Sequence, residues 1–292
     1  MKESFDKKIK ALFVGILLLI GFCINPLQAQ RSEIGLFGGG GFYLGELNPT
    51  HLFAGTQPAG GLVYRYNLSP RWALKANFIF GRVTGSDAKT NKGYERNLSF
   101  FSPITEFSAE AELNFFNLYS STGKNRFTPY IFAGVTIFSF NPKTEYNGTI
   151  YELQSFGTEG QGLEGGPEKT YALTSFAIPF GIGIRATIGR YFSIGAEWGI
   201  RYSFTDYLDD VRGVYYDNEI LRENRGDLIA NLADRSPELT DEHGVALPYH
   251  QAGEQRGNTT THDIYSFFGV VFTVKFGNED TTCDLKLPRK RR

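Results

Sequence analysis

The chain has 292 residues, of which 41% are hydrophobic and 15% aromatic, and it contains 34 glycines but two cysteines. This apolar content excludes a disordered chain, and the cysteine count excludes a disulfide-rich scaffold or a multi-cysteine zinc module. A formal net charge of -1 gives no strongly basic surface for nucleic acid. Abundant glycine and aromatic residues favour many strands joined by tight turns.

The first 29 residues have the pattern of a secretory signal peptide. Four lysines between positions 2 and 10 precede an unbroken apolar run at 11–22, and the small residue Ala29 stands before the expected cleavage site. This run is shorter than the roughly 20 residues that a transmembrane helix needs. Cys23 would be acylated in a lipoprotein signal, but Phe22 stands where such a signal has a small residue. Cleavage leaves Cys283 as the single cysteine, so no intramolecular disulfide is expected.

The chain after this segment alternates with a period of two, which indicates β-strands. Within 193–204, large apolar residues take the even positions and small or polar residues take the odd ones. The same pattern recurs in 176–188. The predicted strands are 33–45, 59–68, 71–83, 106–115, 129–140, 176–188, 193–204 and 263–276.

The predicted connections alternate between short and long. The connections at 67–70 and 189–191 are tight turns, the one at 117–128 is of medium length, and the long ones are 46–58, 86–100, 141–171 and 207–262. Eight up-and-down strands would place all short turns at one end and all long loops at the other, as in outer-membrane barrels. We therefore predict an all-β fold, an eight-stranded antiparallel transmembrane β-barrel with short periplasmic turns and long outer loops. The predicted organisation is a signal peptide at 1–29, a barrel at 30–277 and a basic periplasmic tail at 278–292.

A soluble β-sandwich or a lipocalin-like barrel is the alternative to a membrane barrel. The polar faces of the strands favour the membrane barrel, because they carry mostly Gly, Ser, Thr and Asn with few charges. Aromatic residues near the predicted strand ends also fit the girdles of a membrane barrel. These residues are Tyr64, Tyr66, Trp72, Tyr130, Tyr202 and Tyr265.

Charged residues on the inward faces predict an ion-paired interior. Eight strands leave an interior just wide enough for side chains, where an isolated charge costs several kcal/mol and must therefore pair. The inward set is Arg65, Lys75, Glu106, Glu110, Glu112, Arg185, Glu197, Arg201 and Lys275. We interpret this lumen charge network as a filled plug, with a proton or ion path as the functional alternative.

No motif in the chain indicates catalysis or a cofactor. The glycine run at 38–41 lacks the Lys-Ser/Thr pair and the helix of a phosphate loop, and is better explained by close approach of a bulky neighbour. The four histidines have no metal-ligand spacing, and no tight His/Ser/Asp group is visible. An acidic group, Asp206, Asp209, Asp210 and Asp217, could hold a divalent cation or bridge lipopolysaccharide phosphates. Its spacing fits no EF-hand, so a solvated, capping or turn-forming role is favoured and no metal site is predicted.

Several segments have a distinctive sequence. Many of them lie in predicted loops, where the geometry of a barrel does not require any particular sequence. They are 126–135 (RFTPYIFAGV), 140–144 (FNPKT), 153–163 (LQSFGTEGQGL), 178–181 (IPFG), 197–201 (EWGIR), 204–211 (FTDYLDDV), 232–236 (LADRS) and 255–257 (QRG). Together they resemble the PorG-type outer-membrane protein family of the Bacteroidetes. The resemblance covers residues 31–277.

The resemblance implies a component of the type IX secretion system, which exports cargo carrying a C-terminal signal domain. Such proteins are small barrels that associate with a periplasmic ring of a lipoprotein and its partner (PorK-like and PorN-like) and anchor it under the outer-membrane lipid. It implies no catalytic residue, cofactor or small-molecule substrate. Eight strands are too few to pass folded cargo, which favours an adaptor role. A general membrane-anchoring or adhesin-type barrel is the alternative, and a lipid-modifying enzyme or a solute channel is less favoured.

A ring would dock on the periplasmic face, which carries the turn at 117–128 and the tail. Five cations in the last seven residues make this tail either a solvated segment or a contact for an acidic partner or headgroups. Cys283 is either an idle thiol or the site of a mixed disulfide with a partner. The predicted partner-binding residues are Tyr119, Lys124, Arg126, Cys283, Lys286, Arg289, Lys290, Arg291 and Arg292.

Overall fold

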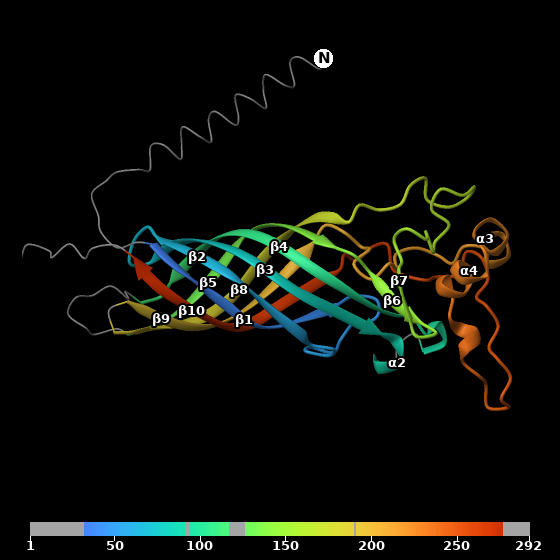
Figure 1. Cartoon of the computed structure of the whole chain (residues 1–292), viewed down its shortest axis with the longest axis horizontal. Coiled ribbons are helices and arrows are strands. Elements are labelled where there is room, and N and C mark those ends of the chain that lie inside the picture. The colour runs from blue at the N-terminus through green and yellow to red at the C-terminus, as the bar shows by residue number, and fades with distance from the viewer. Residues whose placement is uncertain (1–31, 91–93, 117–125, 190, 277–292) are drawn as a thin grey trace, which may run out of the picture. The chain divides into compact units, whose positions relative to one another are not determined.

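The computed structural model describes residues 32–90, 94–116, 126–189 and 191–276 (Figure 1). The predicted signal peptide and basic tail lie outside these residues. Within them, eight antiparallel strands form a closed barrel, in which each strand pairs with the next and β1 pairs with β10. The strands are β1 (Ser32–Leu44), β2 (Gln57–Asn67), β3 (Trp72–Ser86), β4 (Ser99–Asn114), β5 (Phe127–Phe140), β8 (Thr174–Ile188), β9 (Phe192–Ser203) and β10 (Ile264–Phe276). The predicted fold class is confirmed.

The strand bounds agree with the prediction to within three residues except at β4, which begins at Ser99 rather than at 106. Residues 99–105 were not predicted as part of this strand. They contain Pro103, and proline argues against a central strand because it cannot donate a hydrogen bond to a neighbouring strand. The ladder between β4 and β5 starts only at Ile104, while β3 pairs with β4 back to Ser99. Pro103 therefore lies where β4 has the character of an edge strand.

Connections of alternating length place the short turns at one end of the barrel, the turn end, and the long connections at the other, the loop end. The loop-end connections contain elements that the alternation did not predict. They are α2 (Asp87–Thr90), η1 (Tyr94–Arg96), the hairpin of β6 (Lys143–Tyr146) and β7 (Thr149–Glu152), α3 (Asn218–Arg225), α4 (Asp227–Ala233) and η2 (Ser236–Glu238). None of the described helices is long and apolar enough to cross a membrane.

The outer surface of the barrel is apolar, and the predicted alternation is confirmed. Along β8, Phe176, Ile178 and Phe180 are exposed, whereas Ala177 and Arg185 are buried. Other strands add exposed side chains that include Leu36, Leu62, Phe78, Phe107, Val135, Ile182, Val270 and Phe272. Such a contiguous apolar surface would be unstable in water but suits the hydrocarbon of a bilayer.

The interior divides into a charged part toward the turn end and an apolar part toward the loop end. The apolar part is a cluster of buried residues that the inward-facing pattern did not predict. It includes Tyr43, Leu47, Ile79, Val83, Phe100, Ile104, Phe138, Phe140, Leu208, Val211, Tyr265 and Phe267. Leu208 and Val211 come from the connection after β9, so this loop enters the barrel and extends its core.

Two of the six predicted girdle aromatics face the interior, which corrects that assignment. Tyr130 and Tyr265 are at most 1% exposed, and their hydroxyls donate hydrogen bonds to carboxylates. The other four, Tyr64, Tyr66, Trp72 and Tyr202, are exposed. Tyr130 and Tyr265 lie on strands in which apolar and polar residues alternate less regularly. The odd or even position of a residue therefore does not predict which way its side chain faces.

The glycine run allows β1 to approach its neighbours closely. A Cβ added at Gly39 would lie 2.0 Å from the backbone oxygen of Phe268 on β10, and one added at Gly41 would lie 2.6 Å from the Phe267 ring. A Cβ at Gly38 would meet nothing within 4 Å. The glycine at position 39 is therefore required where β1 and β10 close the barrel.

We predict that Gly39→Ala lowers the free energy of unfolding by about 1–3 kcal/mol more than Gly38→Ala, because only the first forces two strand backbones apart. Both substitutions remove the same backbone freedom from the unfolded chain. Urea unfolding of the barrel in phospholipid vesicles measures the difference. Equal losses for the two variants would contradict the close approach at Gly39.

Candidate functional site

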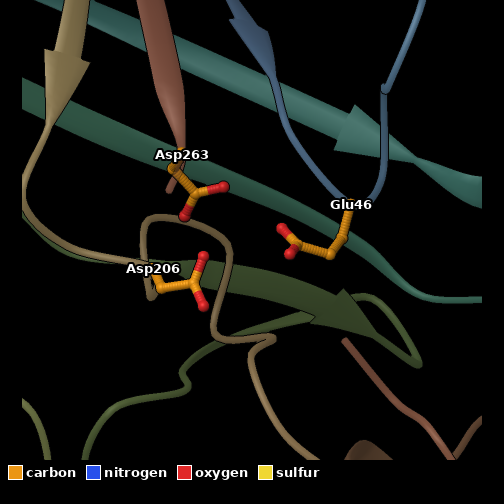
Figure 2. Close-up of side chains that lie close together, drawn as sticks. All are labelled: Glu46, Asp206 and Asp263. Atoms are coloured by element: carbon orange, nitrogen blue, oxygen red, sulfur yellow. The ribbon is translucent and has the colours of Figure 1, made fainter. Parts of the chain in front are cut away.

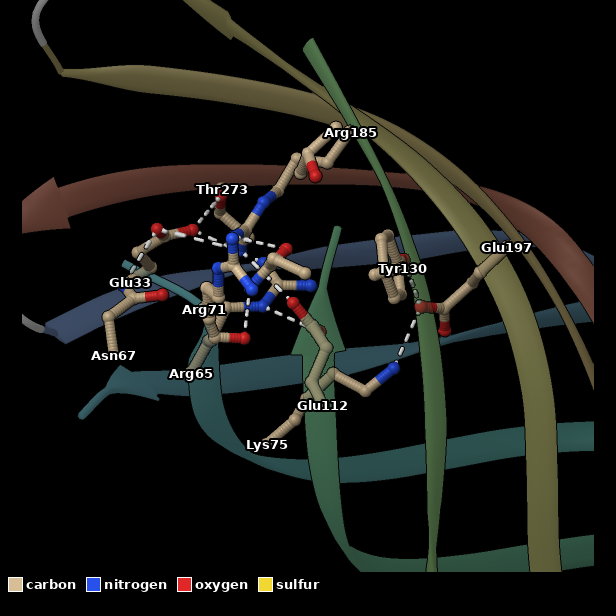
Figure 3. Close-up of polar contacts among 12 residues, drawn as sticks. Glu33, Arg65, Asn67, Arg71, Lys75, Glu112, Tyr130, Arg185, Glu197 and Thr273 are labelled. Carbon is tan, nitrogen blue, oxygen red and sulfur yellow. Dashed lines mark hydrogen bonds and ion pairs between the residues drawn. The ribbon is translucent and has the colours of Figure 1, made fainter. Parts of the chain in front are cut away.

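Ion pairs fill the barrel interior near the turn end (Figure 3). On β2, Arg65 Nη1 lies 3.2 Å from Glu33 Oε2, and its Nε lies 3.0 Å from Glu112 Oε2. From β8, Arg185 Nη1 lies 3.4 Å from Glu112 Oε1 and 3.8 Å from Glu33 Oε1. These side chains are at most 3% exposed. Two cations thus neutralise two carboxylates, and each of these four groups comes from a different strand.

A second group of charges surrounds Lys75 on β3. Its Nζ lies 3.0 Å from Glu110 Oε2 and 2.8 Å from Glu197 Oε2. The Tyr130 hydroxyl donates a 2.9 Å hydrogen bond to the same oxygen of Glu197. Lys75 Nζ also lies 4.1 Å from the centroid of the Phe132 ring, a cation–π contact. The ammonium group is therefore enclosed by two carboxylates and an aromatic face.

Arg201 on β9 joins the charged part of the interior to the apolar part. Its Nη2 lies 2.8 Å from Glu106 Oε1, and the Tyr265 hydroxyl donates to Glu106 Oε2 at 2.9 Å. The guanidinium carbon lies 5.0 Å from the centroid of the Phe267 ring. The aromatic cluster thus begins directly against the last ion pair.

The structure places all seven residues of the predicted lumen network inside the barrel with buried side chains. They are Arg65, Lys75, Glu110, Glu112, Arg185, Glu197 and Arg201. Glu33 was missed, although it shares the odd parity of Phe37 and so could have been assigned to the inward face. With it, five carboxylates (Glu33, Glu106, Glu110, Glu112, Glu197) face five cations (Arg65, Lys75, Arg185, Arg201, Lys275) among the described strands.

Paired charges and aromatic rings occupy the interior of the described barrel. The gap beside Arg65, Tyr130 and Arg185 has no room for a water molecule. Between the barrel and its loops, a cavity near Leu98, Asp209 and Leu232 holds about 10 Å³, roughly the space of one water. An open pore would need the paired charges to separate.

The connections at the loop end form a folded cap over the barrel. Arg256 Nη1 lies 3.0 Å from Glu159 Oε1, which joins the connection after β9 to the one after β5. Arg225, at the end of α3, donates to the backbone oxygens of Phe156, Gly157 and Gln161. The distinctive segments 153–163 and 255–257 therefore supply contacts that hold this cap together.

A second cluster of charge lies at the loop end, where three carboxylates converge (Figure 2). Glu46 follows β1, Asp206 follows β9, and Asp263 immediately precedes β10. One oxygen atom from each lies within 4.8 Å of the others. Asp206 and Asp263 are buried, whereas Glu46 is half-buried. We call these residues the acidic triad.

Further carboxyl groups crowd around the hydroxyl of Tyr43 at this point. It lies 2.5 Å from Asp209 Oδ2 and 2.9 Å from Asp263 Oδ1, yet it has one proton to donate. Burial first, and then the charges of neighbouring acids, raise the pKa of Asp263 and of Asp209 well above the usual range of a carboxyl group. Burial and the charge of Glu46 raise the pKa of Asp206 to about 7.

The predicted acidic group of the 204–217 segment is divided by the fold. Asp206 and Asp209 join the acids near Tyr43, whereas Asp210 accepts hydrogen bonds from Thr158 and Tyr171. Asp217 caps α3, which agrees with the capping role considered for it. Sequence reasoning missed Glu46 and Asp263, although both adjoin predicted strand ends that the up-and-down topology brings to the same end.

The predicted docking residues fall mostly outside the described part of the chain. Arg126 is described and is exposed beside the start of β5 at the turn end. The others, namely Tyr119, Lys124, Cys283, Lys286, Arg289, Lys290, Arg291 and Arg292, lie outside the described residues. Arg126 is therefore the one described position at which docking can be tested with a known exposure.

Comparisons with known proteins find one family model, described as "Domain of unknown function (DUF6089)", over residues 10–231. No curated protein matches the chain. Similar solved structures include Ail, the attachment invasion locus protein of Yersinia pestis, at 10% identity and a TM-score of 0.37, covering 86% of this chain and 100% of Ail. OprG from Pseudomonas aeruginosa matches at 9% identity and a TM-score of 0.37, covering 86% of this chain and 99% of OprG.

We predict that Arg65→Met lowers the free energy of unfolding by about 3–5 kcal/mol, because Glu33 and Glu112 keep their buried charges and lose a partner. Arg82→Met is the control, since Arg82 is an exposed arginine on the neighbouring strand. Urea unfolding in vesicles measures both variants. An equal effect for the two would contradict the strong dependence of the barrel on its interior charges.

We also predict that the purified protein gives no sustained conductance in planar lipid bilayers, because the interior is filled with paired charges and aromatic rings. Single-channel recording at several voltages measures this. Long-lived channel openings by the folded protein would contradict an interior that is closed to ions.

Proposed function

The chain belongs to the DUF6089 family, and we propose that it is a non-enzymatic outer-membrane component of the type IX protein secretion system. In this role it anchors or docks a periplasmic ring complex that export of cargo with C-terminal signal domains requires. The ring consists of a lipoprotein and its partner, PorK-like and PorN-like. Outer-membrane lipid surrounds the barrel.

The sealed interior is the observation that carries this proposal. The barrel interior is filled by Arg65, Lys75 and Arg201 with their carboxylate partners, so it has no room for a polypeptide. Opening it would leave buried charges without partners. A membrane protein that passes nothing acts through its surfaces. The apolar outer belt provides the membrane anchor, and the two ends of the barrel remain for partners.

The proposal places the turn end in the periplasm, as short turns are in outer-membrane barrels. There, Arg126 and the basic tail would meet the ring, and the cap of folded loops would face outward. The resemblance to the PorG-type family supports the assignment to type IX secretion. The loop segments that carry this resemblance also supply contacts within the cap, such as the ion pair between Glu159 and Arg256. They therefore belong to a folded structure.

An affinity purification tests the proposal. The tagged protein is extracted from membranes in mild detergent without crosslinker, and accompanying proteins are identified by mass spectrometry. Recovery of the periplasmic ring proteins is expected. Recovery of the barrel alone, from cells that secrete normally, would reject the adaptor role in favour of an independent membrane anchor or adhesin-type barrel.

A pair of charge reversals at opposite ends locates the docking face. We predict that Arg126→Glu lowers recovery of the ring proteins about tenfold, the effect of about 1.4 kcal/mol, through a reversed charge at the contact. Lys169→Glu makes the same change at an exposed position of the loop end and should leave recovery unchanged. A loss confined to Lys169→Glu would place docking at the loop end instead.

Removal of residues 278–292 tests the tail separately. Reduced ring recovery and reduced secretion of cargo are expected if the tail contributes to docking. Unchanged recovery and secretion would remove the tail from the docking surface and leave the turns of the barrel.

A further inference from the structure

We propose that the acidic triad of Glu46, Asp206 and Asp263 binds a calcium ion at the loop end of the barrel (Figure 2). The sequence suggested a divalent cation only as the less favoured reading of Asp206 and its neighbours in the chain, and it gave no sign of Glu46 or Asp263 as ligands. The site is independent of the proposed role in secretion. Binding is a property of the purified chain alone, so its test does not depend on any ring protein.

The geometry of the triad suits one calcium ion. Calcium binds oxygen atoms at about 2.3–2.6 Å, so two ligand atoms of one ion lie at most about 5 Å apart. The three carboxylate oxygens all lie within 4.8 Å of one another. A set of carboxylates without sulfur or imidazole suits a hard cation such as calcium rather than zinc or copper.

Asp206 provides a second and independent indication of a ligand. Its side chain is 5% exposed, yet neither Oδ1 nor Oδ2 accepts a hydrogen bond from the described residues. The nearest cation is Arg212, whose Nε lies 3.6 Å from Oδ2, beyond hydrogen-bond length. A buried carboxylate without such partners is costly. Figure 2 shows this carboxylate turned toward Glu46 and Asp263, where a cation would satisfy it.

The local charges also lack compensation. The acids around the Tyr43 hydroxyl are Glu46, Asp206, Asp209 and Asp263. The arginines near these acids have other partners or face solvent: Arg96 is bound by both oxygens of Asp87, at 2.8 and 2.6 Å, Arg256 pairs with Glu159, and Arg212 is 48% exposed. A divalent cation held by the three triad carboxylates would supply the positive charge that these acids lack.

The positions of the ligands give the ion a structural role. Asp206 and Asp263 stand at the two ends of the connection between β9 and β10, and Glu46 begins the connection after β1. An ion held by all three would clamp both ends of the longest loop to a third segment. We therefore infer that calcium stabilises the cap against local opening.

Two measurements on the full-length protein in detergent test the site. Calcium binding is followed by titration calorimetry and by terbium luminescence excited through tyrosine, since Tyr43 lies against Asp263. Trypsin cleavage of the cap is compared in 1 mM CaCl₂ and in EDTA. With a Kd of about 0.1 mM, as in extracellular calcium modules, calcium should slow cleavage about tenfold.

Matched variants identify the ligands. Asp206→Asn, and Glu46→Gln as a second variant should the first fail to fold, should abolish binding and make cleavage independent of calcium. Asp227→Asn removes the same charge from the same connection at a carboxylate that is 80% exposed, and should behave as the wild type. Absence of calcium binding by the wild type would overturn the proposal, as would equal binding by the wild type and Asp206→Asn.

Discussion

Pairing of charges inside a closed eight-stranded barrel is the constraint on which the rest of the structure depends. Five carboxylates and five cations occupy the inward faces of the described strands, and chains of contacts such as Glu33–Arg65–Glu112–Arg185 cross several strands. Each group is buried, so none can lose its partner without a large cost. The ion pairs therefore hold the interior filled, which favours a role at the surfaces of the barrel.

The two ends of the barrel differ in construction. At the loop end, the interior changes from ion pairs to an aromatic cluster around Tyr265 and Phe267, and Leu208 and Val211 extend this cluster into a folded cap. The acidic triad lies where that cap meets the strand ends, with a surplus of negative charge. At the turn end, Arg126 is exposed beside the start of β5. This difference between the ends is consistent with the proposed role, in which the turn end meets a periplasmic assembly.

Much of the barrel follows from local sequence. A period of two identified all eight strands, because side chains on a strand alternate between lipid and interior regardless of what the neighbouring strands contain. The alternation of short and long connections predicted their arrangement, since hairpin turns and loops must fall at opposite ends of an up-and-down barrel. The same parity placed seven interior charges, from Arg65 to Arg201, on the inward faces. It failed for Tyr130 and Tyr265, where the pattern is weak.

The sequence by itself thus determined the strands, their order and most of the charged residues that face inward, because these depend on spacing along one chain. Only the tertiary structure decided which charges meet. Glu106 and Arg201 are 95 positions apart in the sequence, and the acidic triad brings Glu46 together with Asp206 and Asp263, which come much later in the sequence. The tertiary structure also revealed the cap. The Glu159–Arg256 ion pair and the hydrogen bonds of Arg225 link loops whose sequences have no alternating pattern. Distances between strands and loops follow from closure of the barrel, and no local pattern encodes them.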